Sequence, residues 1–219
     1  MKPFKPPTPV ATNILIGLCV AVQLGVMVGG DGFAETVIFG FGLIPARISA
    51  ALAGQVGLAG AAGSLVTHMF VHGGWLHLLL NMVFLAWVGR YVEWVVGRGM
   101  LYVLFLVGGL AGAALQVASD PGSFTPVVGA SGAIAAVFGA YAVLFASNRA
   151  ETRRVLGISI SGETLTALWY AATWIALQLL IGFVFSSPGG LQVAIWTHIG
   201  GFIAGLLLAR PWSAGPEID

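Results

Sequence analysis

Long apolar stretches recur along the whole chain, and they constrain its fold more than any other feature. Each is long enough to cross, or nearly cross, about 30 Å of hydrocarbon. Six such windows span residues 12–30, 75–95, 99–118, 130–147, 166–186 and 192–209. Only 8% of the 219 residues are charged, against about 25% in a typical soluble domain. The sequence therefore predicts an all-α membrane protein, a bundle of six transmembrane helices forming one domain over residues 1–219.

The connections between the windows are mostly short. Gly and Pro cluster in them, as at residues 119–122 and 186–190, and such clusters end helices. Residues 31–74 differ, because they are too weakly patterned for a span and too apolar for a solvated loop. We expect this segment to be a first outer loop lying in the membrane interface. Residues 1–11 and 211–219 are expected to be short tails.

The positions of the Lys and Arg residues predict the orientation of the bundle. With six spans, eight of the nine fall on one side: Lys2, Lys5, Arg90, Arg98, Arg149, Arg153, Arg154 and Arg210. Only Arg47 falls on the other side. Cytoplasmic loops carry an excess of positive residues, so we expect both termini to be cytoplasmic and the protein to cross the inner (plasma) membrane. A net charge of +1 without a basic run argues against nucleic acid as a partner.

All four histidines lie in two short stretches. His68, His72 and His77 surround the start of the second window, and His198 lies within the sixth. Ionisable groups at membrane depth are costly and usually mark function. A histidine can also simply bond a neighbouring carbonyl in a packed bundle, so for each histidine alone both interpretations stay open. The single cysteine, Cys19, permits neither a disulfide framework nor a cysteine metal site.

The spacing of polar residues favours a common site. His77 and Asn81 are four residues apart and share one helix face. The second, fourth and sixth windows all begin on the outer side. Ser131 lies near the start of the fourth, and counting from Leu191 puts His198 about 10 Å below the outer edge of its helix. Three helices thus present polar side chains to the same outer half of the bilayer.

Glycines surround the serine and follow the sixth-window histidine. A serine in an apolar helix usually bonds its own i−4 carbonyl, but Gly129 and Gly132 let the chain turn into a helix N-terminus, where free N–H groups favour an oxyanion. Gly201 and Gly205 form a small-residue strip of the kind by which membrane helices pack. We expect this strip to bring His198 within reach of Ser131.

Three stretches together resemble the signature segments of rhomboid intramembrane proteases of the bacterial, six-helix type. They are THMFVHGGWLHLLLNM, PVVGASGAIAAVFGAY and WTHIGGFIAG, in that order. The resemblance implies a catalytic dyad of Ser131 as nucleophile and His198 as base. It also implies that His77 and Asn81 bind the oxyanion together with the Ser131 backbone N–H.

The resemblance also assigns supporting residues. His68 and His72 would support the site and hold water, as neighbours of the reacting groups rather than reactants. Gly129, Gly132 and Gly201 would shape the backbone around the dyad. The element Glu93-x-x-x-Gly97 would be structural, at the cytoplasmic end.

The chain departs from the rhomboid pattern at two places. Four residues after the nucleophile the family usually has an aromatic that packs on the catalytic histidine, and here Ala135 stands there. The orientation of His198 must therefore come from elsewhere. The Trp-Arg pair often found in the first outer loop is also missing, and only Arg47 offers a cation there.

These residues predict an intramembrane serine endopeptidase that cuts transmembrane segments of other proteins near the outer leaflet, with no metal and no cofactor. Its partners would be membrane-protein substrates and the lipid bilayer; the sequence gives no oligomeric state. A catalytically inactive relative that binds membrane clients is an alternative. A haem protein with histidine ligands is another, which a Soret band would reveal. A histidine-lined transporter is a third, although no embedded carboxylates suited to a proton relay and no obvious inverted repeat support it.

Overall fold

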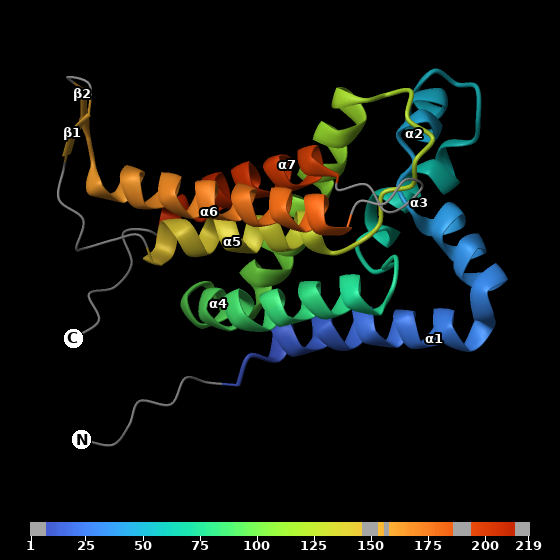
Figure 1. Ribbon diagram of the computed structural model, residues 1–219, viewed down its shortest axis with the longest axis horizontal. Coiled ribbons are helices and arrows are strands. Elements are labelled where there is room, and N and C mark those ends of the chain that lie inside the picture. The colour runs from blue at the N-terminus through green and yellow to red at the C-terminus, as the bar shows by residue number, and fades with distance from the viewer. Residues whose placement is uncertain (1–7, 146–152, 156–157, 186–193, 213–219) are drawn as a thin grey trace.

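The computed structural model describes residues 8–145, 153–155, 158–185 and 194–212 and is mostly helical (Figure 1). Residues 186–190, one of the predicted turns, lie outside the described residues, as do the tail residues 1–7 and 213–219. The elements are α1 (Val10–Phe41), α2 (Pro45–Leu52), α3 (Leu58–Thr67), α4 (Trp75–Ser119), α5 (Ser131–Phe145), β1 (Arg153–Val155), β2 (Ile158–Ile160), α6 (Gly162–Phe185), α7 (Ile195–Leu208) and the 3-10 turn η1 (Arg210–Trp212).

The strands β1 and β2 correct the prediction of a purely α-helical chain. They pair antiparallel, with Arg153 opposite Ile160 and Val155 opposite Ile158. β-branched residues are favoured in strands, and Val155, Ile158 and Ile160 supply them here. The pair lies between α5 and α6, away from the interior of the bundle (Figure 1).

The two longest helices are each interrupted by a glycine. Gly30 breaks α1 with φ 76°, and Gly97 breaks α4 with φ 81°. Glycine adopts this left-handed region without the steric cost of a Cβ. The break at Gly97 falls between two predicted windows, and the break at Gly30 falls at the end of the first. Within the described residues, α1 and α4 are long and apolar enough to cross a membrane, whereas α3, α5 and α7 are shorter apolar helices.

The expected outer loop, residues 31–74, is largely helical. It contains the second part of α1 and all of α2 and α3, which lie at the end of the bundle where α5 and α7 begin (Figure 1). Backbone bonds hold it to the chain that leads into α5: Leu43 pairs with Val127, and Ala46 N–H donates to Ser123 O at 2.9 Å. The alanines of this segment favour helix, which a weak hydropathy pattern does not reveal.

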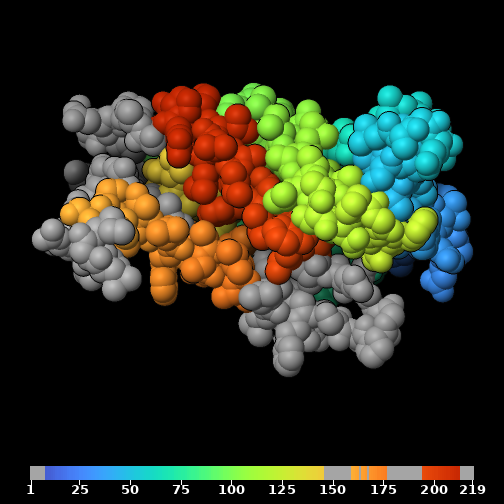
Figure 2. All heavy atoms as spheres, turned by 90° about the horizontal axis from the view of Figure 1, so that it is seen from above, coloured from blue at the N-terminus to red at the C-terminus, as the bar shows by residue number. Residues whose placement is uncertain are grey.

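Helix α5 forms the centre of the bundle, and ten of its fifteen residues are buried. It packs between α4 and α7 through glycines that leave no room for a side chain. A Cβ on Gly205 would overlap Ala136 O, and a Cβ on Gly139 would overlap Phe202 O. Figure 2 shows α7 lying along the second half of α4 on the opposite side from α6. Close backbone contact of this kind is how membrane helices pack without a hydrophobic driving force between them.

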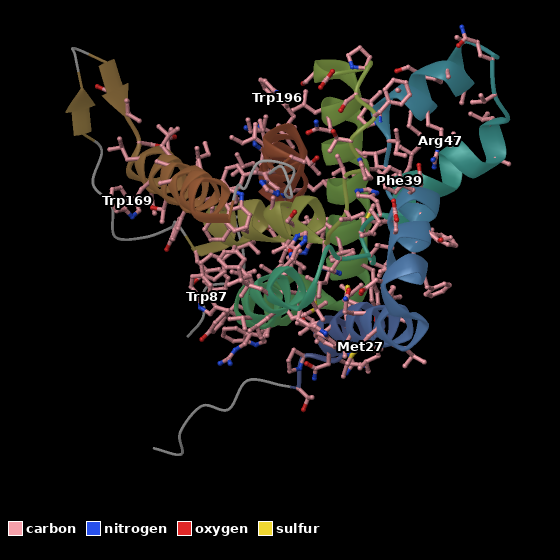
Figure 3. All side chains as sticks on the ribbon, turned by 45° about the vertical axis from the view of Figure 1, so that its right-hand side comes forward. Met27, Phe39, Arg47, Trp87, Trp169 and Trp196 are labelled. Atoms are coloured by element: carbon pink, nitrogen blue, oxygen red, sulfur yellow. The ribbon has the colours of Figure 1, made fainter. Side chains whose placement is uncertain are left out.

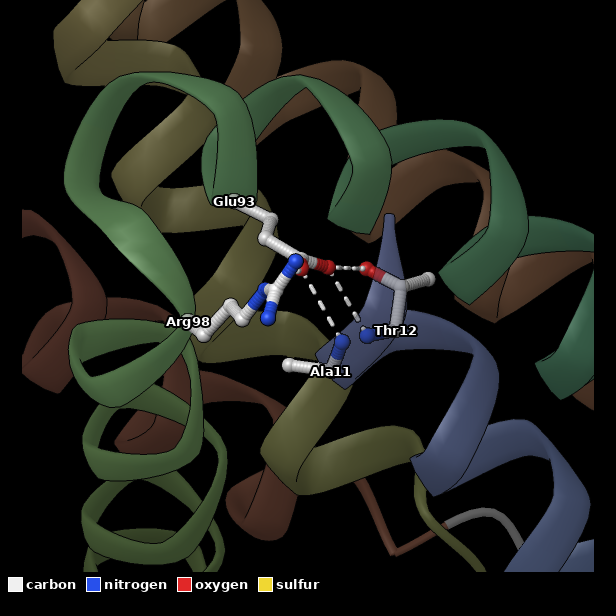
Figure 4. A network of polar contacts seen from close by, with 4 residues as sticks. All are labelled: Ala11, Thr12, Glu93 and Arg98. Carbon is white, nitrogen blue, oxygen red and sulfur yellow. Dashed lines mark hydrogen bonds and ion pairs between the residues drawn. The ribbon is translucent and has the colours of Figure 1, made fainter. Parts of the chain in front are cut away.

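A buried carboxylate joins α1 to α4 (Figure 4). Glu93 accepts hydrogen bonds from the N–H groups of Ala11 and Thr12, both at 2.9 Å, and from the Thr12 hydroxyl at 2.8 Å. Arg98 lies 3.9 Å from the same carboxylate. The first N–H groups of a helix lack intrahelical acceptors, and Pro9 offers α1 no side-chain cap. Glu93 therefore caps α1, which accords with the structural part expected for it.

Candidate active site

Ser131 and His198 meet at the end of the bundle where α5 and α7 begin. Ser131 is the first residue of α5, and His198 lies in the first turn of α7. The Nε2 atom of His198 is 2.7 Å from the Ser131 hydroxyl oxygen. The His198 side chain is buried, with 5% of its surface exposed. The serine hydroxyl and the imidazole therefore form a hydrogen-bonded pair drawn from two neighbouring helices.

The depth predicted for His198 was wrong. Helix α7 begins at Ile195 and not near Leu191, so His198 lies about 4.5 Å along its helix instead of about 10 Å. The apolar pattern continues upstream of the helix, and hydropathy alone does not mark where the backbone becomes helical. The histidine is thus closer to the first residue of α7 than the sequence indicated.

Glycines bring the two helices together beside this pair. A Cβ on Gly201 would overlap Gly132 O, and a Cβ on Gly132 would overlap the Thr197 side chain. The first turns of α5 and α7 are therefore in backbone contact, which leaves His198 within hydrogen-bonding distance of Ser131.

Hydrogen-bond donors occur on α4 beside the turn that leads to Ser131 and at the start of α5. The His77 ring packs against Gly129, where a Cβ would lie 2.7 Å from its Nε2 atom. Because His77 Nδ1 accepts the Gly73 N–H at 3.4 Å, the ring proton must be on Nε2. Asn81 uses one amide hydrogen to donate to His77 O at 2.9 Å and keeps a second. The N–H of Ser131, at the first position of its helix, has no intrahelical acceptor.

His72 and His68 hold the chain that precedes Ser131. His72 Nε2 accepts the Ala130 N–H at 3.4 Å, and its Nδ1 contacts Phe70 O at 3.3 Å. Burial lowers the pKa of His72 to about 3, so the ring stays neutral and able to accept. The carbonyl of His68 accepts the Gly129 N–H at 2.9 Å, and its ring contacts Ser64 O. Both histidines thus fix the backbone of the turn that presents the serine.

Comparison with known proteins identifies the group to which this chain belongs. Residues 59–214 match the Rhomboid domain family. The chain belongs to the rhomboid family. It is similar to RHOMBOID-like protein 5 of Arabidopsis thaliana, 29% identical over 182 residues, which cover 81% of this chain and 54% of that protein. It is also similar to the rhomboid protease GluP of Bacillus subtilis, 32% identical over 145 residues, which cover 66% of this chain and 25% of that protein.

The predicted resemblance to rhomboids is thus confirmed at the level of the family. The chain spans about half, or less, of the length of these curated relatives. Rhomboids are membrane-embedded proteins that include serine proteases and inactive relatives. Within the described parts of the chain, no three His, Cys, Asp or Glu side chains gather as a possible metal site.

One aromatic contact of this rhomboid was not foreseen from the sequence. The Trp174 ring on α6 meets the His198 ring edge to face, with centroids 6.2 Å apart and planes at 71°. Ala135, the residue that stands where rhomboids usually have an aromatic, is fully buried and faces Gly201 across the α5–α7 contact. Nothing in the sequence distinguishes Trp174 from the other six tryptophans, because its contact with His198 depends on how α6 packs.

The other departure from the rhomboid pattern concerns the outer segment. Arg47 donates from Nη2 to Phe39 O at 2.8 Å, and both residues are labelled in Figure 3. Thr67 donates to Phe41 O at 2.7 Å. Arg47 therefore satisfies a carbonyl in the last turn of α1, which helps to hold the segment together without a Trp-Arg pair.

Proposed function

We propose that this rhomboid is an intramembrane serine endopeptidase that cleaves transmembrane segments of other membrane proteins near the outer leaflet. The observation that carries the proposal is the 2.7 Å contact between His198 Nε2 and the Ser131 hydroxyl. A serine is a weak nucleophile until a base accepts its proton, and here the base is already in hydrogen-bonding position.

The proposed reaction proceeds through an acyl-enzyme. His198 Nε2 takes the Ser131 proton while the hydroxyl oxygen attacks the carbonyl carbon of the substrate. The imidazolium then gives this proton to the leaving amine, and the peptide bond breaks. A water molecule next loses a proton to His198 and attacks the ester, and Ser131 regains its proton as the acid product leaves. The dyad thereby returns to its starting state without a cofactor.

The negative charge that develops on the substrate oxygen needs donors that are free in the resting enzyme. His77 Nε2–H, the second amide hydrogen of Asn81 and the Ser131 N–H would supply them. Each such donor typically contributes about 10²–10³ to the rate in other enzymes. Asn81 and His77 are arranged on one face of α4 by their four-residue spacing.

The membrane setting follows from the apolar windows and the charges. Six spans would place Ser131 on the outer side and both termini in the cytoplasm, because eight of nine Lys and Arg residues then face inward. Water must reach the dyad from outside, since polar groups in dry lipid are too costly. A substrate helix hides its carbonyls in i→i−4 bonds, so substrates with helix-weakening residues such as Gly near the outer interface should be cut preferentially.

The test is cleavage of a single-span substrate, with glycine near its outer end, by detergent-purified protein. Wild type should cut it, and Ser131→Ala and His198→Ala should not. A fluorophosphonate probe should label wild type and not Ser131→Ala. Equal cutting by wild type and Ser131→Ala would show that the nucleophile is wrongly assigned. Binding of the substrate without labelling or cutting would instead favour the inactive, client-binding alternative.

A further inference from the structure

Helix α6 contacts the site through one buried side chain. Among the described side chains of α6, only Trp174 is buried, with 6% of its surface exposed. Its neighbours Leu168, Trp169 and Ile175 are 56%, 71% and 42% exposed. Together with the half-buried Tyr170, whose ring centroid lies 5.8 Å from that of Phe138, Trp174 joins the described part of α6 to the interior of the bundle.

The indole of Trp174 touches rings from three other helices. Its centroid lies 4.6 Å from Phe84 of α4, 5.3 Å from Phe138 of α5 and 6.2 Å from His198 of α7. Its Nε1 atom has no hydrogen-bond partner among the described residues. The position of the indole is therefore set by ring packing, and the indole contacts both phenylalanine rings as well as the imidazole.

His198 has little else to fix its ring. Its Nε2 atom bonds Ser131, but its Nδ1 atom has no partner in the described part of the chain. In a serine, histidine and aspartate triad, a carboxylate at this nitrogen holds the ring in the productive orientation. Ala135 offers no ring surface, and its position opposite Gly201 leaves little space for one.

We propose that Trp174 is a positioning residue that holds the His198 ring towards Ser131, so that packing of α6 completes the dyad. This inference rests on the proposed function. An edge-to-face ring contact favours one orientation over others by about 2- to 10-fold. Trp174 touches no reacting atom and acts through the imidazole, taking the part that the Ala135 position plays in other rhomboids.

The experiment compares two readouts in Trp174→Leu, Trp174→Phe and wild type. The first is the rate at which a small water-soluble fluorophosphonate labels Ser131, which does not require a transmembrane substrate to enter between helices. The second is kcat and KM for the single-span substrate. We expect Trp174→Leu to lower both the labelling rate and kcat about 10-fold with little change in KM. Trp174→Phe, which keeps a ring edge, should restore most of both.

Two control variants separate positioning from packing. Trp169→Leu removes an exposed tryptophan from the same helix (Figure 3) and should leave labelling unchanged. Phe84→Leu removes another ring that touches Trp174 and should slow labelling less than Trp174→Leu does. If Trp174→Leu does not fold, Trp174→Met, which fills space without a ring edge, replaces it.

The outcomes distinguish this inference from the proposed function. Labelling of Trp174→Leu at the wild-type rate, or equal slowing by Phe84→Leu, would overturn the positioning role while leaving the protease assignment intact. A change confined to KM would show that Trp174 affects only substrate entry, and would also overturn it. A wild type that is not labelled would overturn the proposed function, and this inference with it.

Discussion

Two buried polar clusters stand near opposite ends of the first half of α4, and they are built differently. His77 and Glu93 are sixteen residues apart on this helix, about 24 Å along its axis. At one end, three hydrogen bonds from Ala11 and Thr12 converge on the Glu93 carboxylate. At the other, His198 Nδ1 and His68 Nε2 have no partner among the described residues.

The difference separates a cluster whose carboxylate oxygens are hydrogen-bonded from one with ring nitrogens that have no partner among the described residues. Buried polar groups are nearly always hydrogen-bonded, and those that are not call for an explanation. The Glu93 cluster uses its acceptor atoms to fix α1 on α4. If the protein is a protease as proposed, donors of the Ser131 cluster would bind the substrate oxygen rather than hold the fold together. Variants of the first should therefore lose stability, and variants of the second should lose activity.

The largest expected effect is on activity at His198. Removing the base with His198→Ala should lower kcat/KM by about 10²–10⁴-fold, the usual contribution of a general base. Its unfolding midpoint in detergent should change little in comparison, because the ring makes one hydrogen bond and its other nitrogen has no partner among the described residues. If His198→Ala kept its activity but had a much lower unfolding midpoint, His198 would stabilise the fold and would not be the base.

The next effect concerns the glycine contact beneath the dyad. In Gly201→Ala the new Cβ would overlap Gly132 O, so α7 must move away from α5. A shift of about 1 Å at a reacting pair can cost about 10²-fold in rate, and overpacking costs about 1–3 kcal/mol. The matched control is Gly99→Ala, where a Cβ meets nothing within 4 Å. Equal activity of Gly201→Ala and wild type would show that this contact does not set the dyad.

At the other cluster, Glu93→Gln should lower stability while leaving activity nearly intact. The amide of glutamine would turn N–H groups towards donors on α1, and a buried unsatisfied group costs about 1–3 kcal/mol. Unfolding in a detergent titration measures the loss, and cleavage by the folded fraction measures activity. Glu35→Gln changes an exposed carboxylate of α1 and should have no effect. Loss of activity without loss of stability would show that Glu93 takes part in the reaction and would contradict its structural role.

What the sequence predicts well here depends on local pattern and on motif. The breaks at Gly30 and Gly97 lie where the apolar windows end, because glycine and hydropathy both act over a few residues. Flanking glycines and a resemblance spread over three segments point to Ser131 and His198, and the catalytic roles of these residues stay a prediction. Their contact of 2.7 Å depends on Gly201, whose small size is visible in the sequence.

What the sequence does not predict depends on contacts between distant segments. Trp174 reaches His198 only through the packing of α6, and Ala11 and Thr12 are 82 and 81 residues from Glu93. The segment of residues 31–74 is held by backbone bonds to the chain before α5, such as that from Ala46 N–H to Ser123 O, and a hydropathy pattern does not reveal such bonds. The predicted start of α7 is wrong because the apolar sequence begins before the first residue of the helix, Ile195.

The smallest expected effect isolates one bond of the Glu93 cluster. Thr12→Val keeps the shape of the side chain and both backbone bonds, but loses the hydroxyl that donates to Glu93 at 2.8 Å. The loss should be about 1 kcal/mol, the net value of one hydrogen bond. Thr36→Val, which removes an exposed bond to Gly32 O, is the control. In combination with Glu93→Gln, the two losses should not add, because residues in one network are coupled. Full additivity would mean that the hydroxyl and the carboxylate stabilise the protein independently. In that case only the bonds from the Ala11 and Thr12 N–H groups to Glu93 would cap α1.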